Sequence, residues 1–248
     1  QLAGQWQRHL HNMIRRSEAF GYRWLTIALD PWHRPQEIDL IPKQRYHLMD
    51  RYLPERGRLA RAMMLLTTSN QVNLDYASEA EAIEMMRTSV AASPFVTAMF
   101  ANSPFSQRQN SGYLCYRGHI WAETDPDRCG LISGLLADPD YSLADYAALL
   151  AELPLIFHFD DQGNSLASGG RNLGQIIAAY GKSTIDADDL ELSIQQLFTE
   201  VRLKKYIEVR GMDCPPPQFT MAIPALWVGL LYDPASREQA GQLCRSLL

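Results

Sequence analysis

The sequence has few lysines, few cysteines and no long apolar run. Only four of its 23 basic residues are lysines, and its four cysteines include no Cys-x-x-Cys pair. Its six histidines form no His-Glu-x-x-His motif. The sequence therefore predicts neither a structural zinc site nor a disulfide framework, and a reducing, cytoplasmic location fits. The longest apolar run, residues 222–232, is interrupted by Pro224 and is too short to cross a membrane.

Acidic residues outnumber basic ones, 28 to 23, which gives a formal net charge of −5 at pH 7. General binding to nucleic acid or to a membrane surface needs a basic face, so this composition argues against both. With 248 residues, 46% of them hydrophobic, the chain is long enough for one substantial core. We therefore expect a single domain over residues 1–248. Because the chain starts without methionine and inside a helix-like pattern, we also expect it to be a fragment of a longer protein.

Hydrophobic periodicity and capping residues predict an α+β fold whose long strands carry polar faces. Helices are expected at residues 2–20, 42–51, 78–92, from Ser142 onward, at 171–180 and 186–198, and twice after the prolines at 215–217. Strands are expected at 22–29, 63–76, 155–159 and 202–212. Residues 100–115 are expected to form a loop.

The expected strand 202–212 alternates polar and apolar residues, so one face collects its polar side chains. That face carries Arg202, Lys204, Tyr206, Glu208 and Arg210. One carboxylate among three cations indicates a site for a polyanion with a metal ion, in which Glu208 coordinates Mg²⁺ and Arg210 holds phosphate. The alternative, which the pattern alone favours, is a solvated sheet face with surface ion pairs.

A second polar face is expected in strand 63–76, where Thr67, Ser69, Gln71, Asn73 and Asp75 alternate with other residues. Five polar groups on one face without a lysine are unusual for a face that is merely solvated. A binding role and a structural role therefore both stay open for this strand.

Three shorter patterns carry weaker signals. Arg117, His119 and Trp121 share a face if their segment is extended, although a single histidine is more often a hydrogen-bonded neighbour than a ligand. Residues 169–174 lack the ending of a phosphate loop and are interpreted as a turn. Residues 125–128 are interpreted as a capped turn. The sequence contains no nucleophile elbow and no defensible catalytic triad.

Residues 206–210, Tyr-Ile-Glu-Val-Arg, resemble a strand of the glutamine synthetase and glutamate–cysteine ligase superfamily that carries a metal-binding glutamate and a phosphate-facing arginine. The wider chain is similar to the plant-type branch of glutamate–cysteine ligase. The matching stretches occur in family order and include residues 42–46, 63–65, 71–75, 100–105, 117–121, 124–128, 200–204 and 224–233. Each stretch alone is a weak match, whereas the ordered set is specific.

This resemblance implies a fold and a reaction. The implied fold is a curved, mainly antiparallel sheet, like the catalytic domain of glutamine synthetase, with helices packed on its outer face. The implied reaction joins the γ-carboxylate of glutamate to the amine of cysteine through a γ-glutamyl phosphate, with ATP and Mg²⁺, as the first step of glutathione biosynthesis. The implied partners are glutamate, cysteine and ATP, and a homo-oligomer is compatible with them.

The resemblance also implies a role for each matching residue. Glu208 corresponds to a metal ligand, and Arg210 to the arginine that stabilises the transferred phosphoryl group. Arg117, as a catalytic residue, and Arg45 are expected to hold carboxylates of the amino-acid substrates. The other expected contacts are, for the substrates, Tyr46, Met64, Thr67, Gln71, Asn73, His119 and Trp121, and, for the nucleotide, Arg202 and Lys204.

The sequence departs from the family pattern in several places. The family has a loop of acidic metal ligands just upstream of the position of residue 1 and a helical region downstream of the position of Leu248. Leu66 and Thr68 stand where an arginine is usual and a cysteine is common. Two alternatives to the cysteine-specific enzyme therefore stay open: a related glutamate ligase with another amine acceptor, or a domain of the same fold that only binds.

Overall fold

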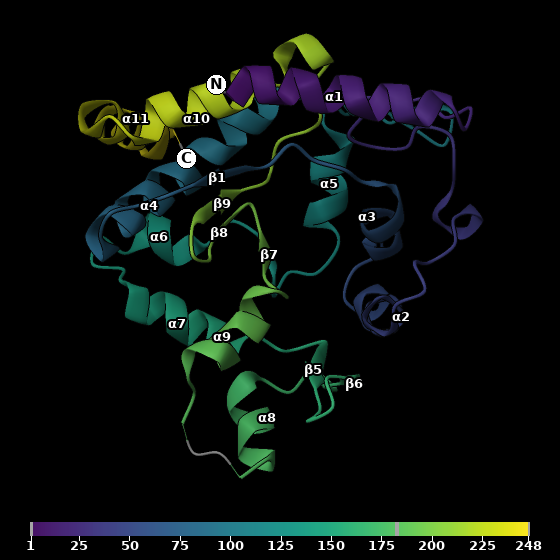
Figure 1. Ribbon diagram of the computed structural model, residues 1–248. Helices are drawn as coiled ribbons and strands as arrows, with labels where there is room; N and C mark the ends of the chain where they lie inside the picture. The colour runs from purple at the N-terminus through teal and green to yellow at the C-terminus, as the bar shows by residue number, and fades with distance from the viewer. Residues whose placement is uncertain (1, 182–183, 248) are drawn as a thin grey trace.

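The computed structural model describes residues 2–181 and 184–247, and their mixture of helices and strands confirms the expected α+β class (Figure 1). The α-helices are α1 (Leu2–Glu18), α2 (Gln44–Tyr52), α3 (Ala60–Leu66), α4 (Glu79–Met99), α5 (Tyr116–Ala122), α6 (Ser133–Ala137), α7 (Leu143–Glu152), α8 (Leu173–Ala179), α9 (Ala187–Ile194), α10 (Ala222–Leu231) and α11 (Pro234–Leu247). The strands are β1 (Val72–Leu74), β2 (Phe105–Ser106), β3 (Gln109–Asn110), β4 (Cys129–Gly130), β5 (Phe157–Phe159), β6 (Ser165–Ala167), β7 (Phe198–Thr199), β8 (Val201–Leu203) and β9 (Ile207–Val209).

A three-stranded antiparallel sheet in the order β1-β9-β8 lies among the helices. Asn73 of β1 pairs with Glu208 of β9, and Glu208 pairs on its other side with Arg202 of β8. Residues directly opposite each other in antiparallel strands share a face, so these three side chains form one row. The other strands form two antiparallel hairpins, β2-β3 and β5-β6, and one parallel pair, β4-β7. A larger curved sheet is not seen in the described residues and stays a prediction.

Helix α4 is the central element of the larger core. It begins after Ser78, whose hydroxyl accepts a hydrogen bond from the Glu81 N–H at 3.2 Å, and the Glu81 carboxylate accepts one from the Ala77 N–H at 2.7 Å. These bonds satisfy free donors at the start of the helix, much as a capping box does. The helix continues through Pro94 beyond its expected end at residue 92, because its buried side keeps packing on β8, β9 and α11.

The buried hydrophobic residues form two clusters. The larger one contains the three-stranded sheet and α4, together with apolar side chains of α6, α7, α8, α10 and α11. The smaller one contains Leu48 of α2, Met63 of α3, Ile120 of α5 and Phe157 of β5. Helices α2, α3 and α5 lie on one side of the sheet in Figure 1, opposite α4 and α6. The apolar side chains of the β8-β9 hairpin belong to the larger cluster, while helices of the smaller cluster lie on the other side of the sheet.

Two of the strand predictions are wrong over most of the residues that they cover. Residues 22–29 make only a single bridge, from Leu29 to Thr67, and Tyr22 and Leu25 are exposed. Within the expected strand 63–76, residues up to Leu66 belong to α3, and only β1 is a strand. Alanine, methionine and leucine have high helix propensity, and a short buried apolar run does not by itself distinguish a helix from a strand.

The expected strand 202–212 is the hairpin of β8 and β9, which turns where the Lys204 N–H donates to the Tyr206 carbonyl at 2.8 Å. Arg202 therefore faces Glu208 across two strands rather than along one. Residues 117–121 are helical in α5, so the common face expected for an extended segment is wrong. In a helix, residues four apart share a side, whereas a residue two positions along points away from both.

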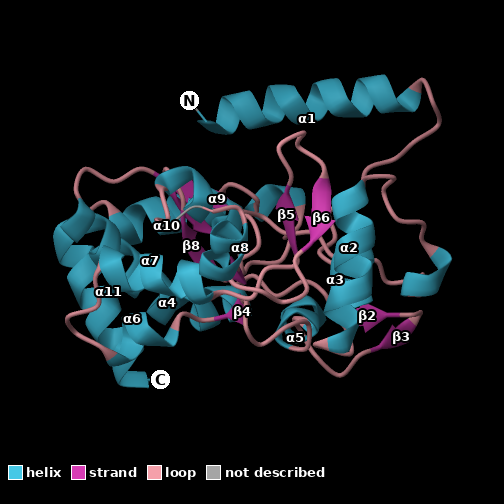
Figure 2. Ribbon diagram, turned by 90° about the horizontal axis from the view of Figure 1, so that it is seen from below, coloured by secondary structure: helices cyan, strands magenta, loops and turns pink. Residues whose placement is uncertain are grey.

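The other expected elements are confirmed with shifted ends. They comprise α1, α2, α7 with its Ser142 cap, α8, α9, α10, α11 and β5, while the expected loop 100–115 contains the short hairpin β2-β3. Helix α1 has no buried side chain and runs along one side of the molecule (Figure 2). In the part of the chain that the structure describes, no helix is both long and apolar enough to span a bilayer.

Residues 125–128 do more than cap a turn, because Asp125 and Arg128 form a fully buried ion pair. The Arg128 Nε donates to Asp125 Oδ2 at 2.5 Å, and Arg128 Nη2 donates to the Pro154 carbonyl at 2.7 Å. Breaking a buried pair leaves an uncompensated charge in the interior, which is far more costly than losing a solvated pair. Arg128, which this ion pair holds in place, therefore ties the turn before β4 to the chain before β5.

Arg128→Met should lower the free energy of unfolding by about 3–5 kcal/mol, because Asp125 would stay buried without its partner. Urea denaturation measures this change. The matched control is Arg58→Met, which removes a solvent-exposed pair with Glu123 and should leave the unfolding midpoint nearly unchanged. Equal stabilities of the two variants would show that the buried pair is dispensable.

Candidate active site

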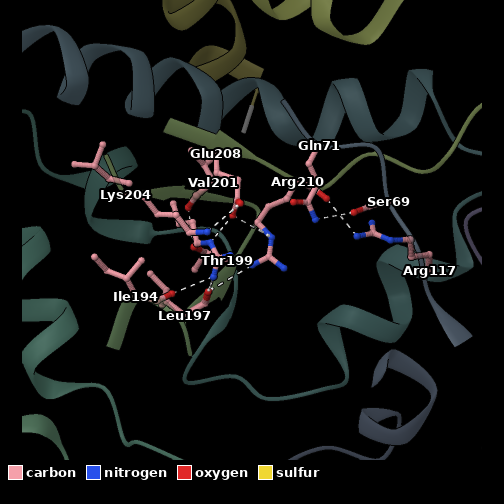
Figure 3. Close-up of polar contacts among 12 residues, drawn as sticks. Ser69, Gln71, Arg117, Ile194, Leu197, Thr199, Val201, Lys204, Glu208 and Arg210 are labelled. Carbon is pink, nitrogen blue, oxygen red and sulfur yellow. Dashed lines mark hydrogen bonds and ion pairs between the residues drawn. The ribbon is translucent and has the colours of Figure 1, made fainter. Parts of the chain in front are cut away.

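The carboxylate of Glu208 lies among three cations on the β8-β9 hairpin (Figure 3). The Nε of Arg202 donates a hydrogen bond to Glu208 Oε2, Lys204 Nζ donates to Oε1 at 3.2 Å, and Arg210 Nε lies 3.9 Å from Oε2. The Glu208 residue is only 5% exposed. The face that the sequence assigns to polar residues is therefore a buried ion-pair cluster, not a solvated surface.

The surroundings of Glu208 and Arg210 shift the pKa of each group. Burial alone would raise the pKa of Glu208, but the hydrogen bond from Arg202 and the charges of Arg202, Arg210 and Lys204 outweigh it and hold the pKa below its ordinary value. Burial and the nearby charge of Arg202 lower the pKa of Arg210 to about 10, against the opposing charges of Glu208 and Glu200. At neutral pH Glu208 is therefore ionised and Arg210 is protonated.

A divalent metal ion does not fit this cluster as it stands. Both oxygens of Glu208 already face cations, and the described residues contain no group of three aspartate, glutamate, histidine or cysteine side chains that could hold a metal. Mg²⁺ prefers several oxygen ligands in an octahedral arrangement. Glu208 as a metal ligand therefore stays a prediction that these residues alone do not support.

A cavity of about 350 Å³ opens next to the hairpin and brings together seven of the expected site residues. Its walls come from α2, α3, α5, the segment between α3 and β1, the first residue of β7 and the residue after β9. The expected residues that line it are Tyr46, Met64, Thr67, Gln71, Arg117, Trp121 and Arg210. Met49, Met63, Thr68, Ser69 and Phe198 complete the lining.

Trp121 lies between two arginines at this cavity. Its ring is 5.5 Å from the guanidinium carbon of Arg117 and 5.3 Å from that of Arg210, and Phe198 meets it edge-on with ring centroids 6.1 Å apart. An aromatic face attracts a cation, most strongly where water is excluded. The indole thus helps to hold two like charges close to one small space.

The two arginines differ in how much of their guanidinium group is already bonded. Arg117 is 3% exposed and donates from Nη1 to the Gly211 carbonyl at 2.9 Å and from Nη2 to the Arg210 carbonyl at 3.2 Å. Arg210 makes one hydrogen bond among the described residues, from Nη1 to the Leu197 carbonyl at 3.4 Å. Arg210 therefore keeps donors for an anion, whereas Arg117 mainly supplies charge and shape.

Several expected site residues lie outside the cavity. Arg45 is exposed on α2, where its guanidinium carbon is 5.1 Å from the Tyr46 ring. His119 stacks on Tyr113 with ring centroids 4.6 Å apart, because it occupies a different side of α5 from Arg117 and Trp121. Arg202 and Lys204 pair with Glu208, as described above.

A larger cavity of about 730 Å³ lies on the other side of the segment that joins α3 to β1. Asn73 lines this cavity and not the smaller one, while Thr68, Ser69 and Gln71 line both. Its other walls are mostly apolar and include Trp6 of α1 and Met221. The polar face predicted around Gln71 and Asn73 thus separates two hollows.

Sequence reasoning assigned no role to Phe198, Met49 and Met63 of the cavity lining, nor to Glu200, two residues after Phe198. Phe198 is the first residue of the short strand β7 and the last residue of the expected helix 186–198, and Glu200 directly follows β7. No periodic pattern marks so short an element. Glu200 occurs in a stretch that resembles the ligase family, and this was the only available signal for it.

Residues 1–248 match the family described as glutamate-cysteine ligase family 2. The chain belongs to this family. Over 231 residues it is 37% identical to the chloroplastic glutamate–cysteine ligase of Arabidopsis thaliana, an alignment that covers 91% of this chain and 44% of the relative. Over 241 residues it is 36% identical to the chloroplastic glutamate–cysteine ligase B of Oryza sativa subsp. japonica, covering 95% and 48%.

The expected resemblance to the plant-type glutamate–cysteine ligases is therefore confirmed. The chain spans about half the length of the curated relatives it matches.

Glu208→Gln should destabilise the protein at about pH 7, and its difference from the native protein should shrink as the pH falls below 4.5. The pKa of Glu208 is lowered from the ordinary value of 4.5, so its ion pairs stabilise the fold above that pH and are lost as the pH falls through the lowered pKa. Thermal unfolding of both proteins across this range measures the difference.

Glu55→Gln, at an exposed position after α2, is the matched control. Its difference in unfolding temperature from the native protein should not depend on pH in this way. If Glu208→Gln and the native protein unfold at equal temperatures at neutral pH, the ion pairs of Glu208 contribute nothing to stability.

Proposed function

We propose that this chain forms part of an ATP-dependent glutamate–cysteine ligase, which joins the γ-carboxylate of glutamate to the amine of cysteine in the first step of glutathione biosynthesis. Family membership supports the ligase chemistry, and the names of the relatives support the two amino acids. The observation that carries the proposal is the small cavity that Arg117 and Arg210 border, because it sets two buried positive charges beside an aromatic and thioether wall.

The reaction needs activation because an amine does not displace oxygen from a carboxylate. A γ-carboxylate oxygen attacks the γ-phosphorus of ATP, the bond to ADP breaks, and γ-glutamyl phosphate forms. The cysteine amine then attacks the carbonyl carbon and loses a proton, and inorganic phosphate leaves. Negative charge develops on phosphoryl and carbonyl oxygens in these steps, and fixed cations lower the barrier by meeting it.

Arg210 is the residue that best fits this charge-stabilising role. Its guanidinium borders the cavity and keeps free donors, and the planar fork of arginine matches two phosphoryl oxygens at once. Arg117 adds a second positive charge, and two of its N–H donors are already used by backbone carbonyls. Phosphoryl transfer relies mainly on such positioned charges rather than on covalent chemistry by the protein.

The remaining cavity residues fit the binding of an amino acid. Gln71 offers side-chain donors and an acceptor and is oriented by a 3.0 Å hydrogen bond from its Nε2 to Ser69 Oγ, while the Thr67 hydroxyl, which donates to the Met63 carbonyl at 2.7 Å, offers an acceptor. Tyr46, Met64 and Trp121 form a wall against which an aliphatic chain or a thiol can pack. Methionine side chains adapt to irregular shapes, so this wall is the part of the cavity suited to select the acceptor.

Mg²⁺ accompanies ATP in such reactions and neutralises phosphate charge. The described residues do not supply its ligands, so the roles above belong to this chain's own cations. The substrate roles expected for Arg45, Asn73 and His119, and the nucleotide roles of Arg202 and Lys204, stay predictions. So do the extension of the three-stranded sheet into a curved one, a homo-oligomer and a cytoplasmic location.

The direct test is phosphate release by the complete protein with Mg·ATP and glutamate, measured with and without cysteine. Release that depends on cysteine is the expected result. Release that depends on a different amine would assign the chain to a related ligase. A folded protein that releases no phosphate with any amine would have kept the fold for binding only.

Arg210→Lys should lower kcat about 10- to 100-fold and change the KM for ATP less than about threefold, because a point charge replaces a bidentate fork in the transition state. Steady-state kinetics of phosphate release measure both constants. Arg51→Lys, at an exposed position of α2, is the matched control and should leave both unchanged. A rise in KM without a change in kcat would instead assign Arg210 to ground-state binding.

A further inference from the structure

Glu200 lies between β7 and β8, and its backbone pairs with that of Arg210, one of the two arginines of the cavity. Its backbone N–H donates to the Gly130 carbonyl at 2.9 Å, and its carbonyl accepts from the Arg210 N–H at 2.9 Å. The first bond joins Glu200 to β4, and the second joins it to the residue that follows β9. The backbone of Glu200 is thus fixed on both sides before its side chain is considered.

The side chain of Glu200 packs into the turn after β9. Gly211 has no Cβ, and a Cβ there would lie only 1.6 Å from Glu200 Oε2. This close approach requires glycine at position 211, because the two atoms could not coexist. Oε2 is buried and has no hydrogen-bond partner among the described residues. Burying a carboxylate in this way is costly unless nearby positive charge offsets the loss of water.

The groups that face this carboxyl come from three elements. Arg117 of α5 and Arg210 favour its ionised form, and Asp213 opposes it, while the neighbouring Thr97 of α4 is uncharged. Burial raises the pKa of Glu200 above its ordinary value despite the two arginines. Both guanidinium groups of the cavity therefore favour the negatively charged form of this carboxyl group.

Arg117 and Gly211 connect that carboxyl to the cavity. Arg117 donates to the carbonyls of Gly211 and Arg210, so the position of this turn fixes the Arg117 side chain. The Arg117 Nε is itself buried without a hydrogen-bond partner in the described part of the chain. A displacement of the turn would therefore move Arg117 and Arg210 together.

We propose that Glu200 is a positioning residue that holds Arg117 and Arg210 at the cavity, by packing against the Arg210–Gly211 turn and by placing a buried carboxylate near both guanidinium groups. This role rests on the proposed ligase function, in which Arg210 meets the developing phosphoryl charge. Two guanidinium groups on one indole repel each other, and a buried counter-charge lets both stay in place. Glu200 itself touches no substrate in this role.

The variant that isolates the charge is Glu200→Gln, which keeps the shape of the side chain. We expect kcat for cysteine-dependent phosphate release to fall about tenfold, with the KM for glutamate changed less than about threefold, because a displaced Arg210 fails mainly in the transition state. Glu200→Asp, which keeps the charge, should recover part of the loss. Glu191→Gln, on an exposed side of α9, removes a charge elsewhere and should leave kcat unchanged.

If Glu200 only fills space, the kcat values of the Gln and Asp variants should rank in the opposite order. Gln would then retain full kcat, Asp would be the impaired variant, and the proposal would be overturned. Gly211→Ala offers a second approach that leaves Glu200 in the sequence, because its new Cβ would push the carboxyl aside. It should reproduce the kcat defect of Glu200→Gln, and full activity in this variant would also overturn the proposal.

A measurement without turnover separates this proposal from the proposed function. The side-chain Nε–H signals of Arg117 and Arg210, assigned by NMR through Arg117→Lys and Arg210→Lys, should exchange with solvent faster in Glu200→Gln than in the native protein. If the native protein releases no phosphate, the ligase proposal fails and these exchange rates alone decide the role of Glu200. Unchanged exchange rates in Glu200→Gln overturn the positioning role, whatever the turnover.

Discussion

Like charges packed together under a small cavity are the constraint on which this structure depends. Arg202, Lys204 and Arg210 project from one short hairpin, and Arg117 reaches the same turn from α5. Such a set is stable only if carboxylates, carbonyls and aromatic faces surround it. Glu208 supplies the negative charge on the β8-β9 side, Trp121 supplies the aromatic face, and the carbonyls of Leu197, Arg210 and Gly211 supply acceptors. The hairpin and the helix α5 are thereby held against each other.

This constraint explains why the charges can be fixed before a substrate arrives. Cations that are already desolvated and bonded need little rearrangement when negative charge develops nearby, and this is the usual origin of electrostatic catalysis. A lysine-rich, solvated face would attract anions just as well but would have to reorganise its water and its side chains. Arg202 and Arg210, with their planar and weakly hydrated groups, are the more buried cations of this hairpin, whereas Lys204 and Lys205 are more exposed.

Sequence reasoning predicted elements whose signals are local, and it missed those that depend on packing. Capped helices such as α4 and α7 carry their start signals in neighbouring residues, so they were found. The run from Met63 to Leu66 is buried on most sides and shows no useful period, and it was assigned to a strand instead of α3. The polar alternation around Glu208 grouped side chains that do lie together, but the turn at Lys204 that folds them into a hairpin has no glycine or proline to mark it. An extended segment would have placed Arg117, His119 and Trp121 on one face, whereas the helix keeps Arg117 with Trp121 and turns His119 away from both.

The cavity lies between the two hydrophobic clusters, so the residues on its two sides can serve different parts of the reaction. Arg210 and the turn after β9 belong to the sheet of the larger cluster, whereas Met63, Met64, Trp121 and Phe198 belong to or pack against the smaller one. Under the proposed function, phosphoryl chemistry depends on the rigid sheet, and recognition of the amino acids depends on helices α2, α3 and α5. Changes in the helical wall can then alter the acceptor without disturbing the charges that activate glutamate. Leu66 and Thr68, where the sequence is expected to depart from the family pattern, lie at the end of α3 and just after it, on the helical side of that division.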